Sequence, residues 1–393
     1  MNLKSILNLF SILILFFSFS YLLPIVVSII FDDGALNIFI ATLILIALLG
    51  SVGAFVTRGA DSNLTQKDGF VIIVLFWVVL SLAGSIPFYL SGMSIMDSVF
   101  ESMSGITTTG ATAISNIDAL PESLLFYRQL LQWMGGMGLI VLAIAVMPLL
   151  GIGGGQIYKT EIPGAMGEQR LTPRIKETAQ ALWSIYFALT VICALLYYIN
   201  GMSVFDAISH AMSTVAIGGF STHNESIGFF NSFSIELICI IFMLLSAFSF
   251  TLHYFAIYKR KPLKYIYDPE LRFFFSILLL IIVIALLISI FNDTNNSPSY
   301  REILFHSVSM LTTTGYSISN TADWPFSISF LLLIGAFIGA CSGSVGGGVK
   351  SWRVLIMLNH AYKNIMKIIH PNSVLSLKIG TKSVNDQVAT SVW

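Results

Sequence analysis

The sequence predicts an all-α polytopic membrane protein, and three observations support this fold class. Only 10% of the 393 residues are charged, whereas about a quarter of the residues of a soluble protein are charged. Hydrophobic residues make up 56% of the chain, and they form runs long enough for helices that cross a bilayer, each of which takes about 20 residues. The three cysteines are isolated in apolar segments, which argues against a disulfide framework and against a C-x-x-C metal site.

Eight apolar segments are expected to span the membrane, and the first is too long and lacks the A-x-A site of a signal peptide. Their ranges are 6–30, 36–56, 70–91, 124–150, 178–199, 233–258, 271–292 and 326–358. Lys and Arg concentrate in cytoplasmic loops, so they indicate the orientation. With the N-terminus inside, 18 of the 20 basic residues lie in inner segments, and only Arg128 and Arg301 lie outside. The acids favour the outer side, with 12 of 20 there, and a negative vestibule attracts cations.

Three long outer connections contain an internal repeat. The segments 92–123, 200–232 and 293–325 each begin with an apolar stretch too short to span, and they align on Gly110, Gly219 and Gly315. An acid stands thirteen residues before each glycine, one serine stands three residues before the acid, and a second serine stands six residues before the glycine. These are Ser94, Asp97 and Ser104; Ser203, Asp206 and Ser213; and Ser299, Glu302 and Ser309. The shared register marks one structural unit used three times.

The repeat predicts a capped half-helix followed by non-helical chain. Ser-x-x-Asp/Glu is a capping box that starts a helix, and about ten helical residues rise ~15 Å, half of the ~30 Å hydrocarbon core. Non-helical backbone at that depth is tolerated where it is buried in protein or lines a watery cavity. Threonine hydroxyls and glycine torsions suit oxygens directed at a cation, as in a potassium filter. A space-filling re-entrant loop is the alternative, and three copies in one register disfavour it.

A glycine-rich segment interrupts the last predicted span. Residues 339–350 read GACSGSVGGGVK, and each glycine in a helix interior costs about 1 kcal/mol relative to alanine. We therefore expect a non-helical break that forms a mobile loop below the filter; close helix packing through small residues is the alternative. Lys350, at the inner edge, either lies in the ion path or extends to the cytoplasm.

Several other polar residues have two interpretations each. Arg128 either braces a filter loop with its five donors or anchors the chain at the membrane interface. His210 and His306 occupy the repeat position of Glu101, and we interpret them as packing or hydrogen-bonding groups of the half-helices. The stretch GIGGGQIY, 151–158, resembles a phosphate loop in composition but lacks the GK[ST] ending, so we interpret it as a helix end.

Five motifs carry a resemblance to a known family. They are SGITTTGA, HAMSTVAIGGFSTH, SMLTTTGYS, LLFYRQLLQWMGGMGLIVLAIAVMP and GACSGSVGGGVKSWR. With them the chain resembles the Trk/Ktr/HKT superfamily of potassium transporters, and in particular the membrane subunit of the bacterial Trk system. The resemblance covers essentially all 393 residues. It implies two extra N-terminal helices followed by helix–pore loop–helix repeats around one pore.

The resemblance also implies which residues act on the ion. The filter residues are Thr108, Thr109 and Gly110; Ile217, Gly218 and Gly219; and Thr313, Thr314 and Gly315. Because Ile217 and Gly218 stand where the other loops have threonines, the second loop offers only backbone carbonyls. The segment 339–350 corresponds to the family's gate, with Gly343, Gly346, Gly347, Gly348 and Lys350 as its residues.

By the same resemblance, potassium is the transported ion and the location is the bacterial inner membrane, with a cytoplasmic N-terminus. A homodimer and a cytoplasmic nucleotide-binding regulatory subunit are the implied partners beside the lipid bilayer. No organic cofactor and no nucleic-acid partner are expected. A channel and a symporter coupled to protons or sodium both stay open at this stage.

We expect five parts in the chain. They are two N-terminal transmembrane helices in 1–69, pore repeat 1 in 70–150, a cytoplasmic loop and pore repeat 2 in 151–258, pore repeat 3 with a broken last helix in 259–358, and a cytoplasmic connector in 359–393. The family has four repeats, so the sequence is expected to be truncated before the fourth. The alternative to potassium uptake is then a non-conducting truncated fragment or a membrane scaffold for the regulatory subunit. A membrane enzyme is disfavoured, because no catalytic grouping falls on one membrane level.

Overall fold

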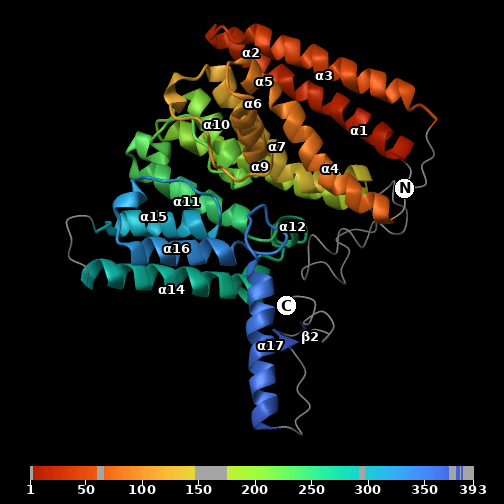
Figure 1. Cartoon of the computed structure of the whole chain (residues 1–393). Coiled ribbons are helices and arrows are strands. Elements are labelled where there is room, and N and C mark those ends of the chain that lie inside the picture. Colours follow the sequence, from red (N-terminus) through yellow and green to blue (C-terminus); the bar gives the residue numbers. More distant parts are fainter. Residues whose placement is uncertain are drawn as a thin grey trace. The chain divides into compact units, whose positions relative to one another are not determined.

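The computed structural model describes residues 3–59, 66–146, 175–291, 297–370, 378–380 and 382–383. Their regular secondary structure is almost entirely helical (Figure 1), which confirms the predicted all-α class. They divide into two compact units, one with the described residues up to Phe242 and the other with those from Met243 onward. The expected helix end at 151–158 lies outside the described residues.

The first unit begins with the two predicted N-terminal helices. The first is made of α1 (Leu3–Ser18), the 3-10 turn η1 (Phe19–Tyr21) and α2 (Leu22–Phe31), and the second is α3 (Leu36–Val56). Together α1, η1 and α2 form one apolar stretch long enough to span a membrane. α1 packs along α3, and the bounds of α3 agree with the predicted segment 36–56.

Repeat 1 has a half-helix packed between two longer helices. Its elements are α4 (Gln66–Gly84), α5 (Ile86–Leu90), α6 (Ile95–Ile106), η2 (Ile117–Ala119) and α7 (Glu122–Val146). α6 contacts both α4 and α7, and α2 also packs against α7. α4 and α5 follow each other with one residue between them, Ser85, which keeps helical torsions and helical backbone hydrogen bonds to Ser81 and from Tyr89, so they agree with the predicted segment 70–91.

Repeat 2 follows the same plan with one break that the sequence did not predict. Its elements are α9 (Ile175–Ile199), α10 (Val204–Ala216), η4 (Ser226–Phe230), α11 (Phe233–Ala247) and α12 (Phe250–Ile257). The half-helix α10 packs against α9 and α7. The predicted continuous span 233–258 is wrong, since α11 and α12 meet at a bend of 96°.

The bend has a physical cause within the second unit. The carbonyl of Ala247 accepts a hydrogen bond from the N–H of Cys341 at 3.1 Å, and the N–H of Phe250 donates to the carbonyl of Gly343 at 2.9 Å. Both backbone groups would pair within a continuous helix. Pairing with the glycine-rich segment satisfies them instead, so the chain turns without leaving these two backbone groups unpaired.

Repeat 3 lies in the second unit. Its elements are α13 (Lys264–Tyr267), α14 (Pro269–Phe291), α15 (Tyr300–Leu311), η5 (Thr321–Asp323) and α16 (Phe326–Ile338), followed by α17 (Ser351–Ile369) and the short strands β1 (Lys378–Ile379) and β2 (Lys382–Ser383). The half-helix α15 packs between α14 and α16. The two strands pair antiparallel, and α17 contacts β1.

The last predicted span, 326–358, is not one helix. α16 ends at Ile338 and α17 begins at Ser351, so residues 339–350 are non-helical; the expected break is therefore confirmed. α17 continues to Ile369, so the segment from 359, which we expect to be a cytoplasmic connector, begins as a helix. Lysines and a polar face give α17 an amphipathic pattern, which a fully lipid-buried span would lack.

The described residues contain fewer uninterrupted spans than the eight predicted. Four helical stretches are long and apolar enough to cross a membrane, and the bent pair α11 and α12 would make a fifth. The four are Leu3–Phe31, Leu36–Val56, Gln180–Ile199 and Pro269–Phe291. Large apolar side chains on them, such as Phe16, Phe55 and Leu279, are exposed, as expected for helices that face lipid.

Candidate ion-binding loops

The three half-helices begin with the predicted serine caps. In each, the serine hydroxyl oxygen accepts a hydrogen bond from the backbone N–H of the acid three residues later, at 3.1 Å for Ser94 and Asp97, 3.0 Å for Ser203 and Asp206, and 3.4 Å for Ser299 and Glu302. Only the third is a complete capping box, because Glu302 also accepts from the backbone N–H of Ser299. The expected starting points of the half-helices are thus confirmed.

The three half-helices also end in the same way. Each closes with the two backbone hydrogen bonds of a Schellman motif, a helix ending in which one residue adopts left-handed torsions. The bonds run from Thr108 to Gly105 and from Thr109 to Ser104; from Ile217 to Thr214 and from Gly218 to Ser213; and from Thr313 to Met310 and from Thr314 to Ser309. The expected filter residues therefore begin where the helix stops.

The left-handed residue is β-branched in every copy, which is unusual. Thr108, Ile217 and Thr313 have φ of 53°, 52° and 66°, although glycine normally takes this position because a branched side chain is strained there. Two residues later, Gly110, Gly219 and Gly315 have φ of 79°, 81° and 84°. The residue between them keeps a negative φ in all three loops. The loops thus share one alternating backbone, and strain of this kind concentrates at functional sites.

In two of the three loops, the second serine of the repeat holds the returning chain by a side-chain hydrogen bond. The hydroxyl of Ser104 donates to the carbonyl of Ala111 at 2.5 Å, and that of Ser309 donates to the carbonyl of Tyr316 at 2.7 Å. Both bonds join the last turn of the half-helix to the residue that follows the filter glycine. Ser213 differs, because its hydroxyl donates to Oε1 of Gln132 on α7 at 2.7 Å.

The first two loops lie against each other within the first unit. A Cβ atom on Gly110 would lie 2.2 Å from the carbonyl oxygen of Gly218, a distance at which real atoms overlap. Gly110 thus has two reasons to be glycine, its positive φ and this close approach. The backbone of loop 1 therefore packs directly on that of loop 2.

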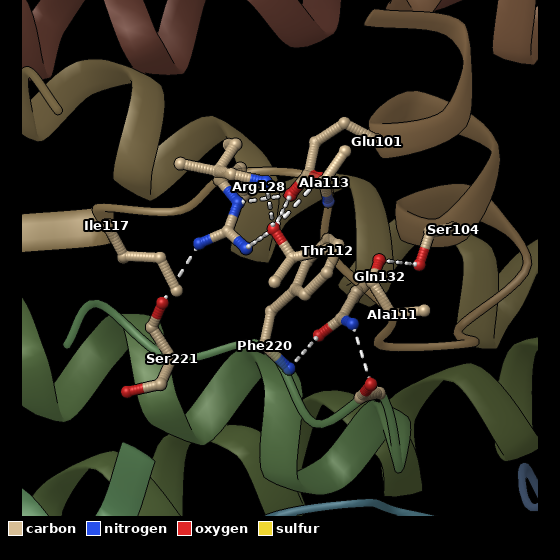
Figure 2. Close-up of polar contacts among 12 residues, drawn as sticks. Glu101, Ser104, Ala111, Thr112, Ala113, Ile117, Arg128, Gln132, Phe220 and Ser221 are labelled. Carbon is tan, nitrogen blue, oxygen red and sulfur yellow. Dashed lines mark hydrogen bonds and ion pairs between the residues drawn. The ribbon is translucent and has the colours of Figure 1, made fainter. Parts of the chain in front are cut away.

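A buried ion pair joins the same two loops (Figure 2). Nε of Arg128 donates to Oε1 of Glu101 at 2.7 Å, and both side chains are fully buried. The guanidinium also donates to the carbonyl of Ser221 at 3.0 Å and to the hydroxyl of Thr112 at 3.3 Å. Its carbon lies 4.2 Å from the centre of the Phe220 ring. Arg128 therefore braces the loops, and the interfacial-anchor alternative is wrong.

The buried Arg128–Glu101 pair is stabilised because both charged groups make several further hydrogen bonds. A buried charge that loses its partner is destabilising by about 3–5 kcal/mol. Glu101 accepts hydrogen bonds from the Thr112 hydroxyl and from the backbone N–H of Ala113 as well as from Arg128. One charged pair thus fixes the half-helix of loop 1, its returning chain and the backbone of loop 2.

His210, which stands at the repeat position of Glu101, also contacts the returning chain of its own loop. Nε2 of His210 lies 2.9 Å from Oγ of Ser221, and Ser221 stands two residues after Gly219, as Thr112 does after Gly110. In loop 3, Nδ1 of His306 lies 2.9 Å from the carbonyl oxygen of Glu302. The expectation that these residues are hydrogen-bonding groups of the half-helices is confirmed.

A polar cluster joins the returning chains of loops 1 and 2. Nδ1 of His223 lies 3.1 Å from Oδ1 of Asp118, and its Nε2 lies 3.3 Å from Oδ1 of Asp206. The side-chain amide of Asn224 donates to the side-chain oxygen of Asn116 at 3.1 Å. Partial burial of His223 alone would lower its pKa, but the hydrogen bonds and charges of the two aspartates outweigh burial and raise the pKa.

Loop 3 contacts the glycine-rich segment inside the second unit. The backbone N–H of Gly347 donates to Oγ1 of Thr313 at 2.7 Å. The segment folds back on itself, with the N–H of Val349 donating to the carbonyl of Phe337 and the N–H of Ser351 donating to that of Ala340. Lys350, at φ 79°, donates from Nζ to the carbonyl of Gly346.

A buried carboxylate holds both ends of this segment. Oε1 of Glu270, at the start of α14, accepts from the backbone N–H of Ser342 at 2.5 Å and from that of Trp352 at 3.1 Å. Glu270 is 5% exposed. The segment is therefore fixed at Thr313, at Glu270 and at the α11–α12 bend.

Sequence reasoning missed two of these residues, Gln132 and Glu270. Gln132 stands four residues after Arg128 in a largely apolar helix, so both lie on one helix face. That spacing of two polar residues inside a predicted span is a signal that could have found it. Glu270 carries no such signal, because an acid in the first turn of a helix is common.

Comparison with known proteins agrees with this geometry. A family model described as cation transport protein, TrkH, matches residues 35–393. The Trk system potassium uptake protein TrkH of Halomonas elongata is 48% identical over 100% of this chain and 82% of that protein, and its namesake from Escherichia coli is 42% identical with the same coverage. The crystal structure of the potassium transporter TrkH from Vibrio parahaemolyticus has a TM-score of 0.89 and 42% identity, over 100% of this chain and 82% of that chain.

These matches establish the family. They cover the whole of this chain and 82% of each of the three relatives. They also agree with the expectation that the protein is not an enzyme, since the family transports cations. The chain belongs to the TrkH family of cation transport proteins.

Proposed function

We propose that this chain takes up potassium across the bacterial inner membrane as the pore-forming subunit of a Trk-type system, with its three Thr/Gly loops as the selectivity filter. One observation carries the proposal: three loops far apart in the sequence share a backbone that alternates between positive and negative φ. Nothing in the packing of an ordinary turn requires a strained β-branched residue at the same place three times. A common task at these residues accounts for it.

The alternation suits an array of oxygens for a bare cation. Potassium filters replace the water around the ion with backbone carbonyls from short non-helical loops. The half-helices α6, α10 and α15 end directly at these loops, and a helix C-terminus carries about half a negative charge. Both features favour a cation over an anion at the loops.

Potassium is the favoured ion because of the relatives. Proteins named for potassium uptake are 42% and 48% identical to this chain over its full length. The filter residues, Thr108 to Gly110, Ile217 to Gly219 and Thr313 to Gly315, remain our assignment by register. The second loop contributes carbonyls alone, since Ile217 and Gly218 have no hydroxyl.

We assign the gate to residues 339–350. The hydrogen bond from Gly347 to Thr313 supports this assignment, because movement of the segment would act directly on a filter residue. The many glycines, Gly343 and Gly346 to Gly348 among them, leave the segment few side chains that pack. Lys350 closes the segment on itself, which favours a structural role over a free charge in the ion path.

The orientation and the partners follow from charge and family. The N-terminus is assigned to the cytoplasm, since 18 of 20 basic residues then lie on the inner side. We propose a homodimer that binds a cytoplasmic nucleotide-binding regulatory subunit. The basic stretch from Lys259 to Lys264 is available to that subunit or to anionic lipid.

Growth on low potassium tests the proposed function. Bacteria without potassium uptake systems, expressing this protein and its regulatory subunit, are expected to grow at micromolar potassium. Accumulation of potassium in the cells is measured beside growth. A protein that reaches the membrane and binds the regulatory subunit but leaves potassium uptake at the level of empty cells would instead be a scaffold.

A further inference from the structure

The middle filter residue differs in loop 2, and its surroundings differ with it. In loops 1 and 3 this residue is a threonine whose hydroxyl bonds to the hydroxyl of the threonine two residues before it. The pairs are Thr109 with Thr107, at 2.8 Å, and Thr314 with Thr312, at 2.7 Å. In loop 2 the same two positions are Gly218 and Ala216, so this hydroxyl pair is missing.

Gln132 of α7 stands in its place. Its Nε2 donates to the carbonyl of Gly218 at 2.7 Å, and its Oε1 accepts from the hydroxyl of Ser213 at 2.7 Å and from the N–H of Phe220 at 3.1 Å. Gln132 is fully buried. Figure 2 shows the amide between the two backbone groups that flank the filter glycine.

The glutamine and the glycine are sterically matched. A Cβ on Gly218 would lie 2.3 Å from both Cδ and Oε1 of Gln132, and 2.8 Å from its Nε2. Gly218 has a negative φ, so its backbone does not require glycine. A threonine at 218 would therefore displace the amide of Gln132 from its hydrogen bonds, and limited space rather than backbone torsion explains why residue 218 has no side chain.

The amide of Gln132 also explains why Ser213 has a different hydrogen-bond partner from Ser104 and Ser309. In loops 1 and 3 the serine at the end of the half-helix bonds to the carbonyl after the filter glycine, whereas Ser213 bonds to Gln132. In loop 2, three hydrogen bonds to Gln132 of α7 thus replace both the threonine hydroxyl pair and the serine-to-carbonyl bond of the other two loops.

We infer that Gln132 is a positioning residue that sets the ion selectivity of the filter by fixing the carbonyl of Gly218. This inference rests on the proposed potassium filter. The carbonyl oxygen of Gly218 is held between the amide of Gln132 and the backbone of Gly110. Its distance to an ion is therefore set by a side chain outside the three loops, and the amide of Gln132 occupies one of the two lone pairs of this oxygen. Selectivity depends on the number and field of such oxygens.

The test compares three variants of the whole protein. In Gln132→Leu the amide is replaced by an apolar side chain of similar size. Gly218→Thr places the missing side chain against Gln132. The triple variant Gln132→Ala, Ala216→Thr and Gly218→Thr restores the threonine pair of the other loops. Gln129→Leu is the matched control, because Gln129 is a fully buried glutamine on the same helix for which the described residues provide no hydrogen-bond partner.

Two readouts are taken on each variant. The first is potassium uptake measured at increasing concentrations of competing sodium. Gln132→Leu is expected to lower the preference for potassium over sodium about fivefold and to leave sodium entry intact. This factor corresponds to the loss of one hydrogen bond of ~1 kcal/mol. The second is thermal unfolding in detergent, in which Gly218→Thr is expected to unfold earlier than the triple variant. A purely structural role would lower uptake of both ions equally.

The outcomes separate the inference from the proposed function. If the unaltered protein transports no potassium, the proposed function is wrong, and the selectivity role of Gln132 is wrong with it. Even then, the steric exchange between residues 132 and 218 is supported if Gly218→Thr unfolds at a lower temperature than the triple variant. If the unaltered protein is selective and Gln132→Leu has the same potassium preference as Gln129→Leu, the inference is overturned. Equal unfolding of Gly218→Thr and the triple variant overturns the steric exchange on which it stands.

Discussion

Oγ1 of Thr313 accepts a hydrogen bond from the backbone N–H of Gly347 at 2.7 Å. Thr313 is the strained residue of loop 3 that we propose as its first filter residue, and Gly347 lies in the glycine-rich segment. A residue with φ of 66° has its side chain directed by the backbone with little freedom. The filter loop and the segment assigned as the gate are thus joined by one bond that a single substitution removes.

Thr313→Val tests this bond without a change of shape. Valine keeps the branched side chain and the backbone strain but accepts no hydrogen bond. We expect potassium flux into liposomes to rise about fivefold, because one hydrogen bond that holds the segment is lost. Thr313→Ser keeps the hydroxyl and should conduct as the unaltered protein does. Equal flux for the valine and serine variants would mean that the bond does not restrain the segment.

Glu270 is expected to hold the gate segment at both ends. Glu270→Ala removes the acceptor from the N–H groups of Ser342 and Trp352, and each buried donor left unsatisfied costs about 1–3 kcal/mol. We predict a loss of ~3 kcal/mol in the free energy of unfolding and faster proteolysis within 339–350. Glu270→Gln keeps an acceptor oxygen and should lose less. Alanine at the exposed Glu225 is the control, and a similar loss there would exclude a specific role for Glu270.

The Arg128–Glu101 pair predicts a non-additive pair of substitutions. Arg128→Met leaves Glu101 buried without its charged partner, so we expect a loss of ~3–5 kcal/mol. Adding Glu101→Gln to Arg128→Met should restore part of this loss, because the uncompensated charge is removed. Arg128→Lys should also be destabilising, since lysine cannot bond Glu101, Thr112 and Ser221 in one plane. Thermal unfolding of the unaltered protein, Arg128→Met, Glu101→Gln and the double variant measures the coupling between the two residues, and simple additivity would contradict an interacting pair.

His223 gives a pH dependence with a defined sign. Its pKa is raised in the folded protein by Asp206 and Asp118, so the folded state binds a proton more tightly than the unfolded state. The stabilisation is fully present below the ordinary histidine pKa of about 6.5 and is lost as pH rises through the raised value. The melting temperature of the protein should therefore exceed that of His223→Gln at pH 5.5 and approach it at pH 9. A difference in melting temperature that stays constant from pH 5.5 to pH 9 would show that protonation of His223 beside the two aspartates does not stabilise the fold.

Local structure was the part that the sequence predicted well. Ser94 with Asp97 and its two counterparts predicted three half-helices, because a cap and the helix that it starts are only a few residues apart. The break at 339–350 was predicted for a similar reason, since glycine weakens a helix wherever it stands. The bend between α11 and α12 was not predicted, because it depends on Cys341 and Gly343, about ninety residues away. Gln132 was missed for the same reason: its partners lie on another repeat.

The most direct measurement of the central claim is potassium uptake by three single variants, Gly110→Val, Gly219→Val and Gly315→Val. Each glycine has φ near 80° in the same register, so a branched side chain at any one of them should distort the loop in the same way. Gly201→Val is the control, because Gly201 has φ of 104° with open space around it and lies outside the filter loops. We predict that each filter variant, present in the membrane at normal amounts, loses potassium uptake or its preference for potassium over sodium, while Gly201→Val keeps both. Normal, potassium-selective uptake by Gly315→Val would contradict the filter assignment.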